Sequence, residues 1–514
     1  MAFNSYGYLL LFLPLVVAAW AIVATRGVRT RAALLIGATL VFYALAAAWA
    51  LPVLLASVVG NYLVSRAILR SEGTVRHRWL TFGVVANVAA LVGVKYGGFL
   101  AENLPAAVGA DAFLVRIALP LGISFFTFQQ IAFLVDTARG RGGAVRPLSY
   151  AAAILFFPAI ISGPIVYVRE FVGQLEATPA RRAMPADLLI GIVLLAIGLF
   201  KKVVIADTLA LWVDPLFAAA ATGAGFGAAA AWGTILGYLM QLYFDFSGYS
   251  DMAIGAARMF GIRLPANFHS PLRVTSIVEW WRRWHMSLGR FVGDYIFQPL
   301  ALPLTRFAAM RGVGRGAMHA LGVLLPTFVA MFVIGAWHGG NWTFIVFGLL
   351  HASYMVAAET WRFVRRKRRK GRVARPWHGL LGNQATLLAV LVALVPFRAP
   401  DMATAAHLWR AMAGMGAGLG AGATTAAIPA AGWGGFALLI ALALAICWLL
   451  PNSMQLLDAH EPVLDWRGWR GVSLPRIAFT WAPTIGWSVG IGLMLFVALA
   501  LVARGSGSFV YFGY

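Results

Sequence analysis

A histidine lies in a glycine-rich break between two long apolar runs, in the segment Gly335-Ala336-Trp337-His338-Gly339-Gly340-Asn341-Trp342. Imidazole has an ordinary pKa of about 6.5, so it can accept a hydroxyl proton near neutral pH. Neighbouring glycines let a substrate approach the backbone, and a helix break frees N–H groups that can stabilise an oxyanion. The residues alone favour a structural histidine bonded to a carbonyl at a helix end, and they leave His338 open as a general base.

A second histidine, His285, lies in the Trp-rich and Arg-rich segment 280–288. It can share a cavity with His338, although such clusters also anchor a helix at the headgroups, and composition favours the anchor. His269, His319 and His351 are predicted to be loop or packing residues. No spacing brings three histidines together as zinc ligands, so we expect no metal site.

Two carboxylates, Asp245 and Asp251, lie in the apolar segment 241–251, and a Lys201-Lys202 pair lies near Asp207. Ionisable groups at membrane depth are costly and mark a pathway or a site by default. The two carboxylates are six residues apart and therefore do not share one helix face, which argues against a glycoside-hydrolase pair. The simplest prediction is that they form buried ion pairs with Arg258, with Arg283 or with a neighbouring helix.

Composition places these residues in a membrane protein, because 61% of the 514 residues are hydrophobic and only 11% are charged. Backbone groups in lipid must pair within their own segment, so the fold class is all-α, a polytopic integral membrane helical bundle. We expect about eleven spans, plus re-entrant or interfacial helices. The expected spans are 8–24, 32–48, 52–69, 80–94, 117–135, 188–200, 317–336, 342–358, 385–395, 435–450 and 485–502.

The net charge of +23 is distributed over short loops between these spans, as membrane orientation requires, and not as a nucleic-acid-binding face. Loops 26–31, 70–78 and 139–146 are basic, whereas the loop between Lys95 and Arg116 carries Glu102 and Asp111. We expect the N-terminus outside and the basic run 362–375 in the cytoplasm, against anionic membrane lipids. Cys447 is the single cysteine and lies inside an apolar span, which excludes a disulfide framework.

The chain is predicted to be one integral membrane domain, 1–514, with N-terminal helices in 1–140, a motif-bearing core in 141–360 and C-terminal helices in 361–514. Two prolines and a glycine interrupt the apolar segment 156–164, which predicts a kinked or re-entrant element. Segment 268–303 is too polar to span and is predicted to lie at the interface or to line a cavity. The Gly/Ala-rich segment 414–431 is predicted to be a linker.

Several motifs together resemble the membrane-bound O-acyltransferases, in their bacterial alginate O-acetyltransferase branch. They are Asn4-Ser5-Tyr6, Pro120–Gln129, Phe157-Pro158 with Ser162–Ile165, Lys201-Lys202 with Ala206-Asp207, Tyr243–Ala253, Trp281–His285 and Trp337-His338-Gly339. The order of the motifs follows the family from the first helix to the last residues. The segment Gly289–Tyr295 departs from the branch, where a tryptophan-containing run is usual, and this leaves the polysaccharide open.

The resemblance implies a tunnel in which an acyl donor on one side meets an acceptor on the other. By this likeness His338 matches the catalytic histidine and His285 the second polar position of the active site. Family members of this branch work with a separate SGNH-hydrolase-like periplasmic transferase. The residues expected to line the tunnel or bind substrate are Asp245, Ser247, Trp281, Arg283, Trp337 and Asn341.

We therefore expect acetyl transfer from acetyl-CoA, with no bound cofactor, to an exopolysaccharide hydroxyl outside a bacterial inner membrane. The alternatives are a transporter or flippase of polysaccharide or lipid intermediates, and D-alanyl transfer to teichoic acid. The aromatic C-terminal tail can be an interfacial belt. It also resembles the Phe-x-Tyr-Phe ending of the branch, which makes Tyr511 a candidate acyl relay.

Overall fold

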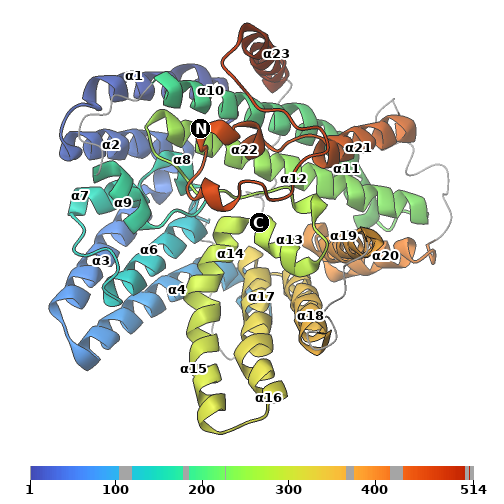
Figure 1. Ribbon diagram of the computed structural model, residues 1–514, viewed down its shortest axis with the longest axis horizontal. Helices are drawn as coiled ribbons and strands as arrows, with labels where there is room; N and C mark the ends of the chain where they lie inside the picture. Colours follow the sequence, from blue (N-terminus) through green and yellow to red (C-terminus); the bar gives the residue numbers. More distant parts are fainter. Residues whose placement is uncertain are drawn as a thin grey trace.

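The fold is a bundle of helices, as the computed structural model shows for residues 2–103, 119–176, 185–225, 227–365, 376–416, 432–503 and 509 (Figure 1). Within these residues the only β-pairing consists of two isolated bridges. This confirms the predicted all-α class. The longer helices are α2 (Val28–Ala47), α3 (Leu51–Arg70), α4 (Gly73–Asn103), α6 (Ile123–Ala138), α10 (Pro185–Leu199), α11 (Asp207–Ala221), α12 (Ala228–Met259), α17 (Leu325–His338), α18 (Trp342–Arg365), α19 (Pro376–Arg398), α21 (Gly432–Leu449) and α23 (Ile485–Val502).

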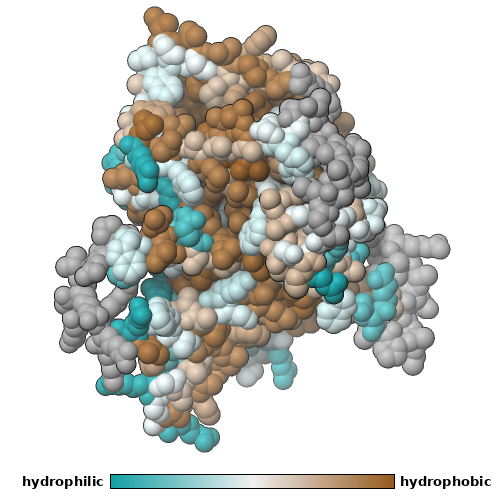
Figure 2. Space-filling model, turned by 90° about the vertical axis from the view of Figure 1, so that its right-hand side faces the viewer, coloured by the Kyte–Doolittle hydropathy of each residue, from teal (hydrophilic) through white to brown (hydrophobic). Residues whose placement is uncertain are grey.

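The described residues contain eight helical runs that are long and apolar enough to cross a membrane. The expected number was about eleven. One of the eight is Val28–Arg70, which has 43 residues and a turn at 48–50, enough for two crossings of about 30 Å. Many outward side chains are apolar, as on α23, where Leu493 is 61% exposed and Phe496 68%. Brown, apolar atoms cover much of the face in Figure 2, as a lipid-facing surface requires.

Helix α12 is the central element, and nearly all of its residues from Thr234 to Met259 are buried. Figure 1 shows α10 running beside it. The two backbones approach closely at Gly198 and Gly248, since a Cβ built on Gly198 would lie 2.5 Å from the carbonyl oxygen of Gly248. Small residues at such a crossing allow tight packing where lipid supplies no hydrophobic drive.

The carboxylates of α12 form buried ion pairs with lysines of η4, a π-helical segment (Phe200–Ala206). Lys201 lies 2.7 Å from Asp251, and Lys202 lies 2.6 Å from Asp245 and 2.8 Å from Asp207. Buried ion pairing with a neighbouring helix was predicted and is confirmed, whereas the two arginines named as alternative partners pair elsewhere. Arg258 pairs with Asp187 and Arg283 with Glu279, because the π turn brings both lysines onto α12.

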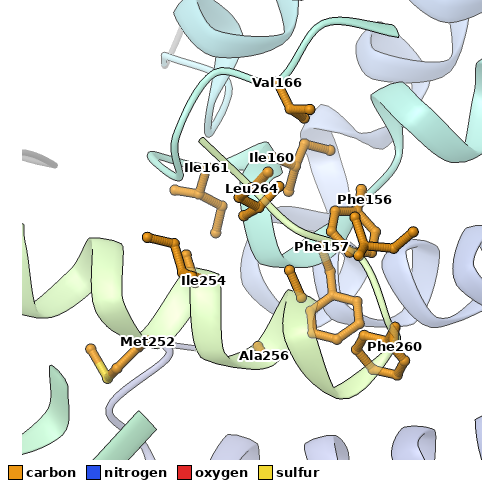
Figure 3. Close-up of a cluster of buried hydrophobic side chains, with 14 of the residues drawn as sticks. Phe156, Phe157, Ile160, Ile161, Val166, Met252, Ile254, Ala256, Phe260 and Leu264 are labelled. Carbon is orange, nitrogen blue, oxygen red and sulfur yellow. The ribbon is translucent and has the colours of Figure 1, made fainter. Parts of the chain in front are cut away.

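Segment 156–164 is buried throughout, and its only helix is the single turn α8 (Phe157–Ile160) between α7 (Pro147–Ile154) and α9 (Val168–Glu176). Phe156 and Phe157 pack against Phe260 at the end of α12 (Figure 3). The hydroxyl of Thr39 on α2 accepts a hydrogen bond from the backbone N–H of Phe157 at 3.0 Å. The irregular backbone is thus enclosed by protein, as predicted.

Segment 268–303 also forms short helices and does not span. It contains η5 (Pro271–Arg273), α13 (Ile277–Arg283), α14 (Met286–Val292), the π segment η6 (Gly293–Phe297) and the first part of α15 (Gln298–Met310). A Ser276 side chain caps α13 by accepting from the N–H of Glu279 at 3.3 Å. Residues 366–375 of the basic run and 417–431 of the expected linker lie outside the described residues.

Candidate active site

His338 is the last residue of α17 and is 6% exposed. Helices α17 and α18 meet at Gly335 and Gly348, where a Cβ on Gly335 would lie 2.3 Å from the Cα of Gly348. A Cβ on Gly339 would lie 2.5 Å from the ring of Phe344. The glycines therefore allow the turn to pack closely against neighbouring side chains, and the expected room for substrate at this backbone is filled.

The end of α17 is held by two consecutive residues of α4. The amino group of Lys95 donates a hydrogen bond to the carbonyl oxygen of Trp337 at 2.5 Å, and the hydroxyl of Tyr96 donates to the carbonyl oxygen of Ala336. The N–H of Gly339 donates to the same Ala336 carbonyl at 3.3 Å. Carbonyls that a helix end leaves without partners are thus satisfied, and the turn that carries His338 has a fixed position.

Aromatic rings surround the imidazole of His338. Its ring centroid lies 4.8 Å from that of Phe397, 5.7 Å from that of Phe347 and 4.8 Å from that of Trp337. Such walls keep bulk water from the ring.

His285 also lies close to Trp337, with ring centroids 6.2 Å apart, and it lines a cavity together with His338. Its backbone is in the left-handed region, with φ of 46°, and Nδ1 lies 3.0 Å from Oδ1 of Asn267. A non-glycine residue in this region is uncommon and marks a place where the fold imposes the conformation. His285 is 2% exposed and is therefore buried in the core, which argues against the interfacial anchor.

A third histidine belongs to the same place. His351 of α18 is 2% exposed, and its Nδ1 accepts a hydrogen bond from the indole N–H of Trp281 at 3.2 Å. From the sequence, His351 is predicted to be a loop or packing residue, because nothing in its apolar surroundings indicates a site. Its spacing of thirteen residues from His338 spans a turn, so only the folded hairpin of α17 and α18 brings the two together.

Three cavities meet around these side chains. The histidine cavity, of about 30 Å³, is lined by His285, His338 and His351 together with Trp281. The Arg290 cavity, of about 730 Å³, shares Trp281 with it and is also lined by Arg282, Arg290 and Glu359. The Lys95 chamber, of about 150 Å³, shares His338 with the histidine cavity and is also lined by Ser124, Ser162 and Trp337. His338 thus lines the histidine cavity and the Lys95 chamber, whereas Trp281 lines the histidine cavity and the Arg290 cavity.

Trp281 and Trp337 are the expected tunnel residues that line these cavities. Segment 268–303 lines the Arg290 cavity from Met286 to Phe297, as predicted for a cavity-lining element. Four other expected residues lie elsewhere. Asp245 pairs with Lys202, Ser247 lines a separate small cavity with Lys201, Arg283 pairs with Glu279, and Asn341 donates to the carbonyl of Pro400 at 2.9 Å.

Tyr511 lies outside the described residues, but Phe509 is described and is 2% exposed. Its ring packs edge-on against Tyr249 at 4.7 Å, and the amino group of Lys202 lies 4.7 Å from its centroid. The hydroxyl of Tyr249 accepts a hydrogen bond from the N–H of Ser162, which lines the Lys95 chamber. At Phe509 the chain after α23 therefore returns to the protein core.

The fold and the site define a polytopic membrane protein with a buried histidine between two cavities. A family model for MBOAT, the membrane-bound O-acyltransferase family, matches residues 114–381. The chain is 36% identical over 408 residues to the peptidoglycan O-acetyltransferase of Helicobacter pylori, covering 74% of this chain and 73% of that protein. It is 36% identical over 425 residues to a probable alginate O-acetylase AlgI of Azotobacter vinelandii, covering 81% and 79%.

This chain belongs to the membrane-bound O-acyltransferase family. A more distant similarity, 29% identity over 245 residues, relates it to the teichoic acid D-alanyltransferase of Streptococcus thermophilus, covering 47% of this chain and 57% of that protein. The protein is an O-acyltransferase of the multi-pass membrane type, as the motifs predicted.

Proposed function

We propose that this protein takes an acetyl group from acetyl-CoA in the cytoplasm and delivers it to a hydroxyl on the outer side of a bacterial inner membrane. The product feeds the O-acetylation of an extracytoplasmic polysaccharide. The observation that carries the proposal is the position of His338, which lines both the histidine cavity and the Lys95 chamber. An acyl group that passes from one side to the other has to pass this imidazole.

The Arg290 cavity is the donor side. Glu359 of α18 lines it, and α18 then leads into the basic run, which by loop charge is cytoplasmic. Arg282 is exposed at this cavity and forms no ion pair with a described residue, so its guanidinium can bind the phosphates of coenzyme A. Arg290 adds a second positive charge, although two of its nitrogens are bonded to Glu170.

His338 is the general base in this proposal. The acceptor oxygen attacks the acyl carbon as the imidazole takes its proton, and the C–S bond of the thioester then breaks as the sulfur leaves with a proton. His285, held by Asn267 and lining the same cavity as His338, orients the reacting groups. Both histidines lie on rigid elements, which holds the reacting atoms at fixed positions relative to one another.

Tyr511 is proposed to accept the acetyl group and pass it to an SGNH-hydrolase-like partner outside the membrane. The support is Phe509, which precedes Tyr511 by two residues and lies in the core beside Tyr249. Tyr511→Phe keeps the ring and removes only the hydroxyl. We expect it to abolish polymer acetylation and to remove the acetyl mass from the C-terminal peptide. Normal acetylation in this variant would show that the tail acts only as an anchor.

The decisive experiment incubates inverted membrane vesicles, whose cytoplasmic face is outside, with acetyl-labelled acetyl-CoA. We expect label on the protein or on its acceptor, and no label with right-side-out vesicles. A flippase gives no label in either orientation. Label from D-alanyl carrier protein but not from acetyl-CoA would instead indicate a D-alanyltransferase.

A further inference from the structure

Helix α6 begins at the wall of the Lys95 chamber without a side-chain cap. Its N-cap residue is Gly122, with φ of 73°, and a Cβ there would lie 2.3 Å from the carbonyl oxygen of Ile160. Glycine is therefore required, and the N-cap offers no side-chain oxygen. Backbone carbonyls of Pro120 and Gly122 accept from the N–H groups of Ile123, Phe125 and Phe126. In the described part of the chain, the N–H of Ser124 has no hydrogen-bond partner.

The side chain of Ser124 is a second indication of a ligand in this chamber. Ser124 is 8% exposed and lines the chamber, and its hydroxyl forms no hydrogen bond with any described residue. Because no described residue takes this hydroxyl's hydrogen bond, a ligand in the chamber can accept it. Ser124 therefore offers two donors, its N–H and its hydroxyl, at the positive end of a helix of 16 residues.

Lys95 adds a positive charge to the same chamber. It lies within α4, one of the candidate spans, and no described carboxylate lies within ion-pair distance of its amino group. One of its three N–H donors reaches the carbonyl of Trp337, which leaves donors for a further acceptor. An unpaired cation at membrane depth marks a functional site by default.

We propose that Lys95 and Ser124 form the oxyanion site of the acyl transfer, opposite His338. The ligand is the negatively charged oxygen of the tetrahedral intermediate. When the acceptor oxygen bonds to the acyl carbon, the carbonyl π pair moves onto the carbonyl oxygen, and His338 holds the acceptor's proton. The electron pair on the oxyanion re-forms the carbonyl double bond as the C–S bond breaks. The leaving thiolate takes the proton from His338.

The Lys95 chamber is better suited to stabilise the oxyanion than the helix break after His338 is. That break was expected to provide the donors, but the N–H of Gly339 is bonded to Ala336 and a phenylalanine ring covers the glycine. The Lys95 chamber instead has a cation, a helix N-terminus and a hydroxyl within about 150 Å³. Preorganised donors of this kind need no reorganisation as the charge develops.

This inference rests on the proposed acetyl transfer, and the test uses the full-length protein in vesicles with acetyl-CoA. Lys95→Met removes the charge and nearly keeps the shape, and Ser124→Ala removes the hydroxyl. Loss of one such donor lowers kcat on the order of 10²-fold in other enzymes, and we expect a loss of this order for Lys95→Met and a smaller one for Ser124→Ala. KM for acetyl-CoA stays unchanged, because the charge exists only during the reaction.

The control variants separate this role from structural support. Thr127 is also buried, lies about one turn later in α6 and does not line the chamber, so Thr127→Val leaves kcat unchanged. Tyr96→Phe removes the adjacent hydrogen bond to α17 without removing charge. Lys95→Arg keeps the charge and restores part of the rate lost in Lys95→Met.

Methylphosphonate, a small tetrahedral anion, gives a readout that does not depend on turnover in the variants. We expect it to inhibit the wild type, and to raise its melting temperature. In Lys95→Met and in Ser124→Ala, both effects should require at least a tenfold higher concentration of methylphosphonate than in the wild type. Tyr96→Phe should not show this increase. If the wild type transfers acetyl while these two variants match Thr127→Val in kcat and in methylphosphonate response, the oxyanion site is wrong and the acetyltransferase stands. If the wild type transfers no acetyl, the proposed function itself fails.

Discussion

The indole N–H of Trp281 donates to Nδ1 of His351 at 3.2 Å, which joins the wall of the Arg290 cavity to the histidine cavity. Because Nδ1 accepts, His351 is neutral, and its own N–H is on Nε2. The bond fixes the ring at the place where the two cavities meet. A site inside a membrane thus depends on a residue of α13 and a residue of α18 that are 70 residues apart.

The hydrogen bond between Trp281 and His351 predicts the effect of Trp281→Phe. This change keeps an aromatic ring at the cavity junction and removes only the donor, so His351 becomes free to rotate. We expect kcat for acetyl transfer to fall about tenfold, as for loss of one supporting contact around a reactive group. Trp409→Phe is the control, because it removes a similar indole bond, to Val392, away from the cavities. Equal rates in both variants would show that the bond has no part in transfer.

The close crossing of α10 and α12 predicts that Gly198→Ala destabilises the protein. An added methyl group would lie 2.5 Å from the carbonyl oxygen of Gly248 and 2.8 Å from the side chain of Met252. Overpacking of this kind costs about 1–3 kcal/mol, so the melting temperature in detergent should fall by several degrees. Gly233→Ala in α12 has open space around its Cβ and should not lower it. A melting temperature for Gly198→Ala equal to that of the wild type would contradict the packing.

A buried histidine outside the spans predicts a pH dependence of stability. His269 is 0% exposed, and burial lowers its pKa from 6.5 to about 4. Between these values the unfolded chain takes up a proton that the folded protein excludes, so the contribution is complete above about pH 6.5 and is lost as the pH falls towards 4. We expect the melting temperature to fall less between pH 7 and pH 5 in His269→Gln than in the wild type.

The control for this pH dependence is His77→Gln, on the exposed start of α4. It should follow the wild-type curve, because this exposed side chain contributes little buried area to the fold. The same slope in His269→Gln and the wild type would mean that His269 does not titrate on unfolding.

The sequence predicted the elements whose signals are local. Apolar length indicated the spans, the prolines at 158 and 164 indicated the buried re-entrant segment, and the break around His338 indicated the site. The span count differed because the two segments expected at 32–48 and 52–69 form the single run Val28–Arg70. In addition, Gly7–Val23 and the 16-residue helix α6 are shorter than the other candidate spans.

Lys95, Ser124 and His351 could not be recognised in this way. They come from α4, α6 and α18, and only packing brings each of them beside His338. Ser124 is one hydroxyl among many in an aromatic run, and its significance is the missing partner, which a sequence does not reveal. The pairing of Asp245 and Asp251 with adjacent lysines depended on a π turn that no composition indicates.

The central claim is that His338 carries the acyl transfer, and one measurement tests it most directly. Purified wild type and His338→Ala are reconstituted in vesicles and supplied with acetyl-labelled acetyl-CoA. The label on protein and acceptor is then compared at equal amounts of folded protein. We expect label transfer by the wild type and a loss of at least 10²-fold in His338→Ala, as for removal of a general base. His319→Ala, a histidine that stacks on Phe363 outside the three cavities, should retain activity. Label transfer at the wild-type rate by His338→Ala would contradict the account.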